Sequence, residues 1–293
     1  MGNHQQMTDV DLQHTLNRGR VGGCLEKIIV AVGGILLSIG FMASMVPLTV
    51  IGIILVIIGS AIGRGARHLA HQATYDTIVP EVLLRFFDRI DLHPDQSQME
   101  LNPETSDIPL VPHSELDMSG YVQFTYQGLK GELCNVVLPD VTQFLNDQTE
   151  MREERKYVAY RGQWLVCELN ETFPTGLTLW PRGKMDKLFR TPTIKMADEK
   201  MNQRMNLSCD HEAWAMTFLD AERMAQLRQL MDAAFAEFSV SLHADGKLYI
   251  AVHSGHDFFD IGKCREKPEV LRQRFLDEMK WWTDMMKVFI PAN

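Results

Sequence analysis

The sequence predicts an α+β protein, with an N-terminal transmembrane helical hairpin followed by a cytosolic domain of mostly antiparallel sheet and flanking helices. Three observations carry this prediction. A run of 36 residues, 28–63, contains no charged side chain. Two stretches of alternating apolar and polar residues flank an Asp-Gly turn at Asp245, which is typical of a β-hairpin. An apolar stripe at helical spacing follows over 268–289.

The overall composition is that of a globular chain. It has 293 residues, of which 45% are hydrophobic and 23% charged, which excludes a disordered, collagenous or polytopic membrane protein. Five scattered cysteines do not form a disulfide scaffold and are expected to be reduced thiols. A net charge of -9 argues against a nucleic-acid partner.

The uncharged run is too long for a single membrane crossing. As one straight helix it would extend about 54 Å, whereas a hydrocarbon core is about 30 Å thick. Pro47 lies near its middle and disfavours a continuous helix. We therefore expect two helices, 28–45 and 47–64, joined by a tight turn. The alternative is a buried hairpin in a soluble protein; a signal peptide would be shorter and begin earlier.

Basic residues flank the hairpin on both sides. Arg18, Arg20 and Lys27 precede it, Arg64 and Arg67 follow it, and the turn has no charge. The positive-inside rule then puts both termini in the cytoplasm, at a bacterial inner (plasma) membrane, with the lipid bilayer as a partner. The expected organisation is a cytosolic tail (1–27), a transmembrane hairpin (28–64), a helical connector (65–91) and a cytosolic α+β domain (92–293).

Small residues recur every four positions in the hairpin. Gly34 with Ser38, and Gly59 with Gly63, form patterns that permit close helix approach. They pack the hairpin against itself or, alternatively, form a homo-oligomer. No ionisable residue lies within the span, which argues against an ion pathway.

Past the hairpin the chain is strongly acidic. Residues 69–293 carry 24 basic and 35 acidic groups, a net charge of -11, so anionic lipids are expected to repel this part. In the connector, Pro80 is placed to begin a new helix. Strand-like runs follow, with irregular stretches between them. We expect strands near 121–126, 133–138, 164–169, 177–180 and 205–209, irregular chain over 92–118 and 181–200, and a polar loop or short helix over 143–155.

Two short helices are expected after the strand at 205–209. Asp210 is placed to cap a helix that runs through Trp214, and Asp220 to cap the next. The second helix has an apolar face suited to a core. This face consists of Met224, Leu227, Met231 and Phe235.

The hairpin around Asp245 has a predictable register. A two-residue turn would mix its apolar and polar faces, whereas a three-residue loop, 244–246, pairs Leu242 with Leu248 and Val240 with Ile250. We therefore expect Gly246 in the left-handed region.

The final helix is expected over 268–289 and to dock on the sheet. Trp281 and Trp282 cannot face the same side of one helix, so we expect Trp281 to be exposed or in an interface.

Three stretches resemble one known family: YVAYRGQWLVCELNETFPTGLTLWP (157–181), MNLSCDHEAWAMTFLDAERMAQLRQL (205–230) and VSLHADGKLYIAVHSGHDFFDI (240–261). They are similar to an uncharacterised bacterial membrane-anchored family, number three-one-three-seven in the domain-of-unknown-function series, as is SGYVQFTYQGLKGEL (119–133). The resemblance implies a two-helix hairpin followed by a cytosolic α+β domain, without known catalytic residues. It also implies a membrane-protein partner such as a LemA-type protein.

Candidate chemistry is sparse. His253, His256 and Asp257 have side chains that bind divalent metals, although a surface turn that contains histidines explains them equally. Cys209 and His211 are a thiol and an imidazole close in sequence, or a strand end beside a helix cap. There is no phosphate-binding loop, dinucleotide fingerprint or Gly-x-Ser-x-Gly motif, so no cofactor is predicted.

One basic stretch stands out in the acidic domain, either as a site for an anionic ligand or as a solvated loop. Its centre is the group Arg182, Lys184, Lys187 and Arg190, with Lys156 and Arg161 before it.

Together these features predict a non-enzymatic, membrane-anchored cytosolic module that binds or scaffolds a partner. The alternative is a ligand-sensing membrane effector whose hairpins oligomerise. A third hypothesis is a hydrolase that uses His253 and His256.

Overall fold

The computed structural model describes residues 8–145, 152–183 and 194–290. The chain forms two compact units. The first contains the chain up to Val82 together with Phe259–Leu276, and the second contains Leu83–Phe258 and the chain from Asp277 onward. Each unit is described by itself.

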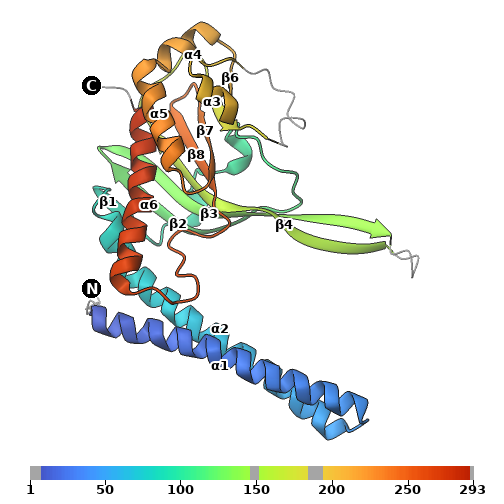
Figure 1. Cartoon of the computed structure of the whole chain (residues 1–293). Helices are drawn as coiled ribbons and strands as arrows, with labels where there is room; N and C mark the ends of the chain where they lie inside the picture. Colours follow the sequence, from blue (N-terminus) through green and yellow to red (C-terminus); the bar gives the residue numbers. More distant parts are fainter. Residues whose placement is uncertain (1–7, 146–151, 184–193, 291–293) are drawn as a thin grey trace. The chain divides into compact units, whose positions relative to one another are not determined.

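The first unit is built on two long helices that lie side by side, α1 (Asp9–Met42) and α2 (Val46–Leu83) (Figure 1). Thr8 caps α1 by accepting a hydrogen bond from the Asp11 N–H at 3.3 Å. The tight turn before Pro47 is confirmed, since α1 ends at Met42 and α2 begins at Val46. Pro47 lies in the first turn of α2, where proline is tolerated. Both helices extend well beyond the uncharged run.

α2 continues through the expected connector as far as Leu83, and Pro80 does not begin a new helix: it lies inside α2. Its neighbours Ile78, Val79 and Val82 are fully buried, and this packing outweighs the loss of one backbone hydrogen bond. The end of the expected connector is instead a short strand, β1 (Arg89–Asp91).

The ends of the two helices away from their turn form a small core with the returning segment 259–276. Leu12 and Leu16 on α1, Ala70 on α2, and Leu271 and Phe275 on the return are fully buried. The residues before the apolar run therefore belong to a packed helix.

The second unit contains one eight-stranded sheet, in the order β1-β2-β3-β4-β8-β7-β5-β6, and the strand pairings among the described residues are antiparallel. This confirms the α+β class. The remaining strands are β2 (Asp117–Tyr126), β3 (Leu129–Leu145), β4 (Arg152–Glu168), β5 (Leu177–Pro181), β6 (Met205–Cys209), β7 (Glu237–Leu242) and β8 (Lys247–His253).

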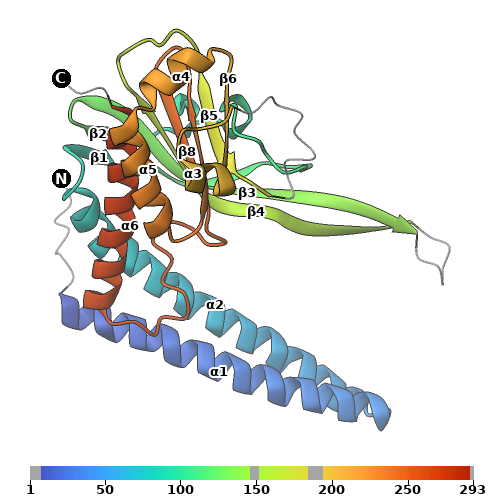
Figure 2. The same ribbon diagram turned by 45° about the horizontal axis from the view of Figure 1, so that its top comes forward.

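Four helices accompany the sheet: α3 (Glu199–Arg204), α4 (Glu212–Phe218), α5 (Ala221–Ala233) and α6 (Pro268–Phe289). Part of α6 from Asp277 onward belongs to this unit and packs on the sheet beside α5 (Figure 2). The other face of the sheet carries the segment 101–118, which packs on a cluster around Trp164 and Tyr249. Short 3-10 turns occur at Gln96–Gln98 and Pro103–Thr105.

The β7–β8 hairpin has the predicted register, with Leu242 opposite Leu248 and Val240 opposite Ile250. Gly246 has φ +90°, as expected for its left-handed position. A Cβ there would also lie 2.0 Å from the Glu171 carbonyl oxygen, so two independent constraints require glycine.

The polar stretch 143–155 is not a loop or short helix, and that prediction is wrong for its described part. Residues 139–145 pair with 152–158 as a continuation of β3 and β4 beyond a bulge at Leu138/Pro139. The result is a two-stranded ribbon that projects from the sheet (Figures 1 and 2). The side chains of residues 154–158 are exposed, so this part of the ribbon has no buried face, and its sequence lacks the alternation that marks a strand with one face in a core.

The first of the two predicted helix caps is wrong. His211, not Asp210, caps α4, through a hydrogen bond from the Trp214 N–H to its Nδ1 at 3.4 Å. Asp220 caps α5 as predicted, by accepting from the Arg223 N–H at 2.9 Å.

Trp281 is not exposed, contrary to the prediction. It is 6% exposed, and its ring packs edge-on against Phe238 on β7, with 5.3 Å between the ring centroids. Its indole N–H donates to the Leu230 carbonyl at 3.0 Å. Two adjacent tryptophans are buried because the helix packs against the sheet on one side and α5 on the other.

Candidate functional site

The most developed site in the second unit begins with a row of four residues across the sheet. Trp164 on β4 lies opposite Ala251 on β8, and Ala251 lies opposite Ser239 on β7. Trp180 on β5 follows Leu179, the partner of Val240, so it lies beside Ser239. Two tryptophans therefore stand at the ends of a floor made of two small side chains.

The segment Ile108–Val111 forms a wall over this floor, and together they enclose a cleft of about 480 Å³. This volume falls in the usual range for small-molecule sites, roughly 300–1,000 Å³. Most of the lining is apolar, from the two indoles, Ala251 and the 108–111 segment. The cleft has the size and chemistry to hold a ring system or short apolar chain.

Polar groups lie at the mouth of the cleft. Arg182, Glu237 and His253 line it and are exposed. The His253 ring stacks on Tyr160 with 4.7 Å between centroids, and the Tyr160 hydroxyl donates to the Val252 carbonyl at 3.1 Å. Burial raises the pKa of Tyr160, so its hydroxyl stays neutral at physiological pH.

Three donors at the cleft lack acceptors. The indole nitrogens of Trp164 and Trp180 are buried and have no hydrogen-bond partner among the described residues. An unpartnered buried donor costs about 1–3 kcal/mol, so its position is unfavourable unless something else accepts the bond. Arg182 likewise has no ion pair within the described part of the chain.

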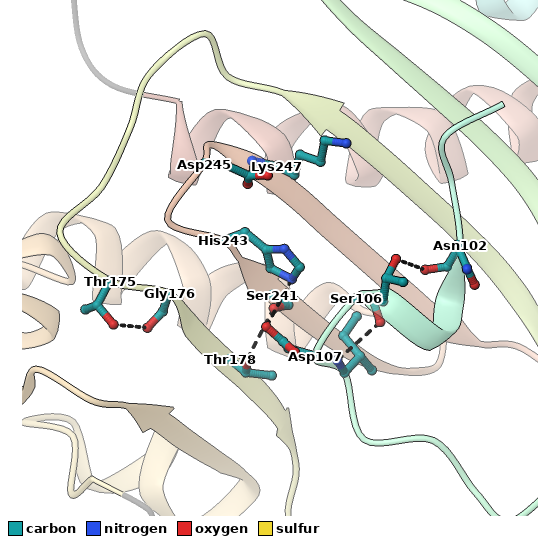
Figure 3. Close-up of polar contacts among 12 residues, drawn as sticks. Asn102, Ser106, Asp107, Thr175, Gly176, Thr178, Ser241, His243, Asp245 and Lys247 are labelled. Atoms are coloured by element: carbon teal, nitrogen blue, oxygen red, sulfur yellow. Dashed lines mark hydrogen bonds and ion pairs between the residues drawn. The ribbon is translucent and has the colours of Figure 1, made fainter. Parts of the chain in front are cut away.

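A polar cluster, drawn in Figure 3, lies on the same face of the sheet as the cleft, because Ser241 and Thr178 are each two residues from a residue of the row, Ser239 and Trp180. His243 Nε2 lies 3.3 Å from Asp107 Oδ2, and the Thr178 and Ser241 hydroxyls lie 3.2 Å apart. Asp107 has φ +58°, which is uncommon for a residue with a side chain. A Ser-His-Asp set is present in composition, but the Ser241 hydroxyl is paired with the Thr178 hydroxyl, so the triad geometry is not formed. Asp107 is far from His243 in the chain, so no local sequence pattern indicates this cluster.

The candidate metal ligands do not form a metal site. His253 stacks on Tyr160, whereas His256 Nδ1 lies 3.1 Å from the Asp257 carbonyl oxygen. The Asp257 carboxylate lies 3.9 Å from the Arg161 guanidinium. Within the described residues, no three His, Cys, Asp or Glu side chains are arranged to hold a metal ion.

The cysteine–histidine pair is also explained by local structure. Cys209 Sγ accepts from the backbone N–H of His211 at 3.4 Å, while the His211 ring caps α4. Burial raises the pKa of the Cys209 thiol, which opposes formation of a nucleophilic thiolate.

The basic stretch is divided. Arg182 lies at the cleft mouth, Lys156 pairs with Glu115, and Arg161 is near Asp257. The other three members, Lys184, Lys187 and Arg190, lie outside the described residues. Of the predicted anion site, the structure therefore places only Arg182, and it places it beside a cleft.

The small residues of the hairpin have different surroundings. A Cβ at Gly59 would meet Ile29 at 3.0 Å, and one at Gly63 would collide with the Glu26 side chain, which pairs with Arg67 at 2.9 Å. Gly34 has open space, and Ser38 Oγ only donates to the Gly34 carbonyl. The Gly34/Ser38 pair therefore does not pack the hairpin against itself.

Taken together, these features define an α+β domain joined to two helices long and apolar enough to cross a membrane. Residues 158–289 match the model of a family described as "Protein of unknown function (DUF3137)". The family resemblance of the sequence is confirmed over this stretch. No curated protein and no solved structure matches the chain significantly.

Proposed function

We propose that the chain is a non-enzymatic module, anchored in a bacterial inner membrane by α1 and α2, whose α+β unit binds a partner protein. Both termini lie in the cytoplasm in this proposal, on the basis of the flanking basic residues. A LemA-type membrane protein is a candidate partner by family resemblance alone.

The exposure of the apolar helix surfaces supports the anchor most directly. The most apolar 18-residue windows of α1 and α2 are only 11% and 17% buried. Large side chains such as Ile35, Phe41 and Ile57 are 59%, 80% and 61% exposed. A core helix of a soluble protein buries such residues, whereas a bilayer covers them with lipid.

The projecting ribbon supports the proposal that this unit binds a partner protein. Its seven residue pairs extend about 23 Å beyond the sheet. β2 pairs with β3 only as far as Val137, and β8 pairs with β4 only from Gln163 onward, so neither outer edge of the ribbon has a strand partner among the described residues. A two-stranded ribbon is marginally stable in water, and its open edges are a template for strand addition.

Two measurements test the proposal. Alkaline carbonate washing of native membranes should leave the full chain in the pellet, and release into the supernatant would refute the anchor. Photo-crosslinked pull-down from native membranes should recover a defined partner with the wild type but several-fold less with Val158→Glu on the ribbon. Val270→Glu is the matched control, because Val270 is similarly exposed, 51% against 56%, but lies on α6. Equal recovery of the partner with both variants would exclude the ribbon as the surface that binds it.

A second function, a ligand-sensing effector whose hairpins oligomerise, is supported by the cleft and by the open Gly34 surface. Gly34→Leu should then lower the oligomeric state in detergent without separating α1 from α2. A chain that is monomeric with and without small anions would refute this function.

A further inference from the structure

We propose that the cleft between Trp164 and Trp180 binds an amphipathic organic anion, an apolar body that carries a carboxylate or phosphate. It goes beyond the proposed partner binding and names the class of ligand for the ligand-sensing alternative, but it depends on neither the membrane anchor nor oligomerisation.

The floor of the cleft determines the body of the ligand. Adjacent strands lie about 4.8 Å apart, so the Cα atoms of Trp164 and Trp180 are separated by about 14 Å over three strand spacings. Ser239 and Ala251 leave the space between the indoles unfilled. A flat ring system or a folded acyl chain fits on this floor beneath Ile108–Val111, with aromatic side chains at both ends.

The polar groups determine the charge of the ligand. Arg182 and the indole N–H groups of Trp164 and Trp180 can only donate, the Ser239 hydroxyl and the His253 imidazole can donate or accept, and Glu237 is the one carboxylate among the lining residues. Both indole nitrogens are buried and have no hydrogen-bond partner in the described part of the chain. Since three lining groups can only donate and one can only accept, the site favours a ligand that brings acceptor oxygens.

The test is calorimetric titration of the full chain in zwitterionic nanodiscs, with empty nanodiscs as the blank. The probes are 1-naphthyl phosphate, the neutral 1-naphthol, and inorganic phosphate. We expect saturable binding of naphthyl phosphate, weaker binding of naphthol, and the weakest binding of inorganic phosphate. Repeating the titration in nanodiscs with phosphatidic acid separates the two sources of the anion, because a lipid headgroup that occupies the cleft would compete.

Two variants locate the binding. Arg182→Gln should lower the affinity for naphthyl phosphate about tenfold, as expected for loss of one charge-assisted contact. Ser239→Leu fills the floor and should abolish binding of both naphthyl probes. Arg228→Gln is the matched control, because Arg228 pairs with Asp198 and does not line the cleft.

Each result bears on the proposal. Loss of binding in Arg182→Gln and Ser239→Leu, with retention in Arg228→Gln, supports it. Absence of saturable binding to the wild type, equal affinity for naphthol, or affinity unchanged in both cleft variants would overturn it. Circular dichroism and a thermal melt of each variant check that lost binding does not reflect lost folding.

Discussion

The packing of the two apolar helices leads to a quantitative prediction for paired glycine substitutions. A Cβ at Gly52 would lie 2.7 Å from the Gly33 carbonyl oxygen and 2.7 Å from the Leu37 nitrogen, both backbone atoms that cannot rotate away. Gly52→Ala therefore forces α1 and α2 apart. Such overpacking costs about 1–3 kcal/mol, against a gain of up to about 1 kcal/mol from helix propensity.

Gly34→Ala is the matched control, because a Cβ there meets nothing within 4 Å while the gain in helix propensity is the same. The two substitutions should therefore differ by about 1–3 kcal/mol in the free energy of separating the helices. Sodium dodecyl sulfate titration in mixed micelles measures this, with spin labels at Ile35 and Ile54 reporting the distance between helices. Equal effects of the two substitutions would refute the packing assigned to Gly52.

Three further predictions concern regions outside the apolar helix surfaces. Trp282 is fully buried and its indole N–H has no acceptor among the described residues. In urea unfolding, Trp282→Phe should therefore lower the free energy of unfolding by less than about 1 kcal/mol, and Trp282→Ala by about 3–5 kcal/mol. Equal losses in the two variants would contradict this. Arg272 pairs with Asp9 at 2.9 Å and Glu81 at 2.8 Å, and because these carboxylates are 50% and 40% exposed, Arg272→Met should cost only about 1 kcal/mol, and less in 1 M salt; a loss that salt does not reduce would exclude an ionic origin. Burial raises the pKa of Cys167 to about 12, so the free energy of unfolding should fall as pH rises from about 8.5, where the thiol of the unfolded chain begins to ionise. Cys167 should also resist modification by maleimide at pH 8 until the chain unfolds. Labelling of the native chain would contradict its burial.

Elements that depend on local patterns could be predicted from the sequence. The register of the β7–β8 hairpin follows from keeping Leu242 and Leu248 on one face, and the helix 268–289 follows from its apolar spacing. Both signals lie within a short stretch of chain, so no knowledge of distant contacts was needed. The turn before Pro47 was predictable for the same reason.

The candidate site could not be predicted, because its geometry depends on strand order. No local sequence pattern brings Trp164 and Trp180 together, because the order β4-β8-β7-β5 is what places Ala251 and Ser239 between them. Likewise, Asp107 meets His243 only because the 101–118 segment crosses the sheet face. To predict the burial of Trp281 from the sequence, one would have to know that α5 and α6 cover the same face of the sheet.

The two apolar helices and the remainder of the first unit cannot be separated without loss of structure. Cys264, Leu271 and Phe275, which come late in the chain, are at most 1% exposed. Gly19 lies against Cys264 and Ala70, and the Arg20 guanidinium donates to the Cys264 and Arg265 carbonyls at 3.3 and 2.6 Å.

A fragment that begins after the hairpin would therefore expose an apolar surface at the start of α6. Because α6 continues without a break into the second unit, loss of this packing would reach a helix that also contributes Trp281 and Trp282 to the core of that unit. Binding experiments on this protein accordingly use the full chain, and a loss of binding in a fragment without α1 and α2 has to be compared with its loss of folding.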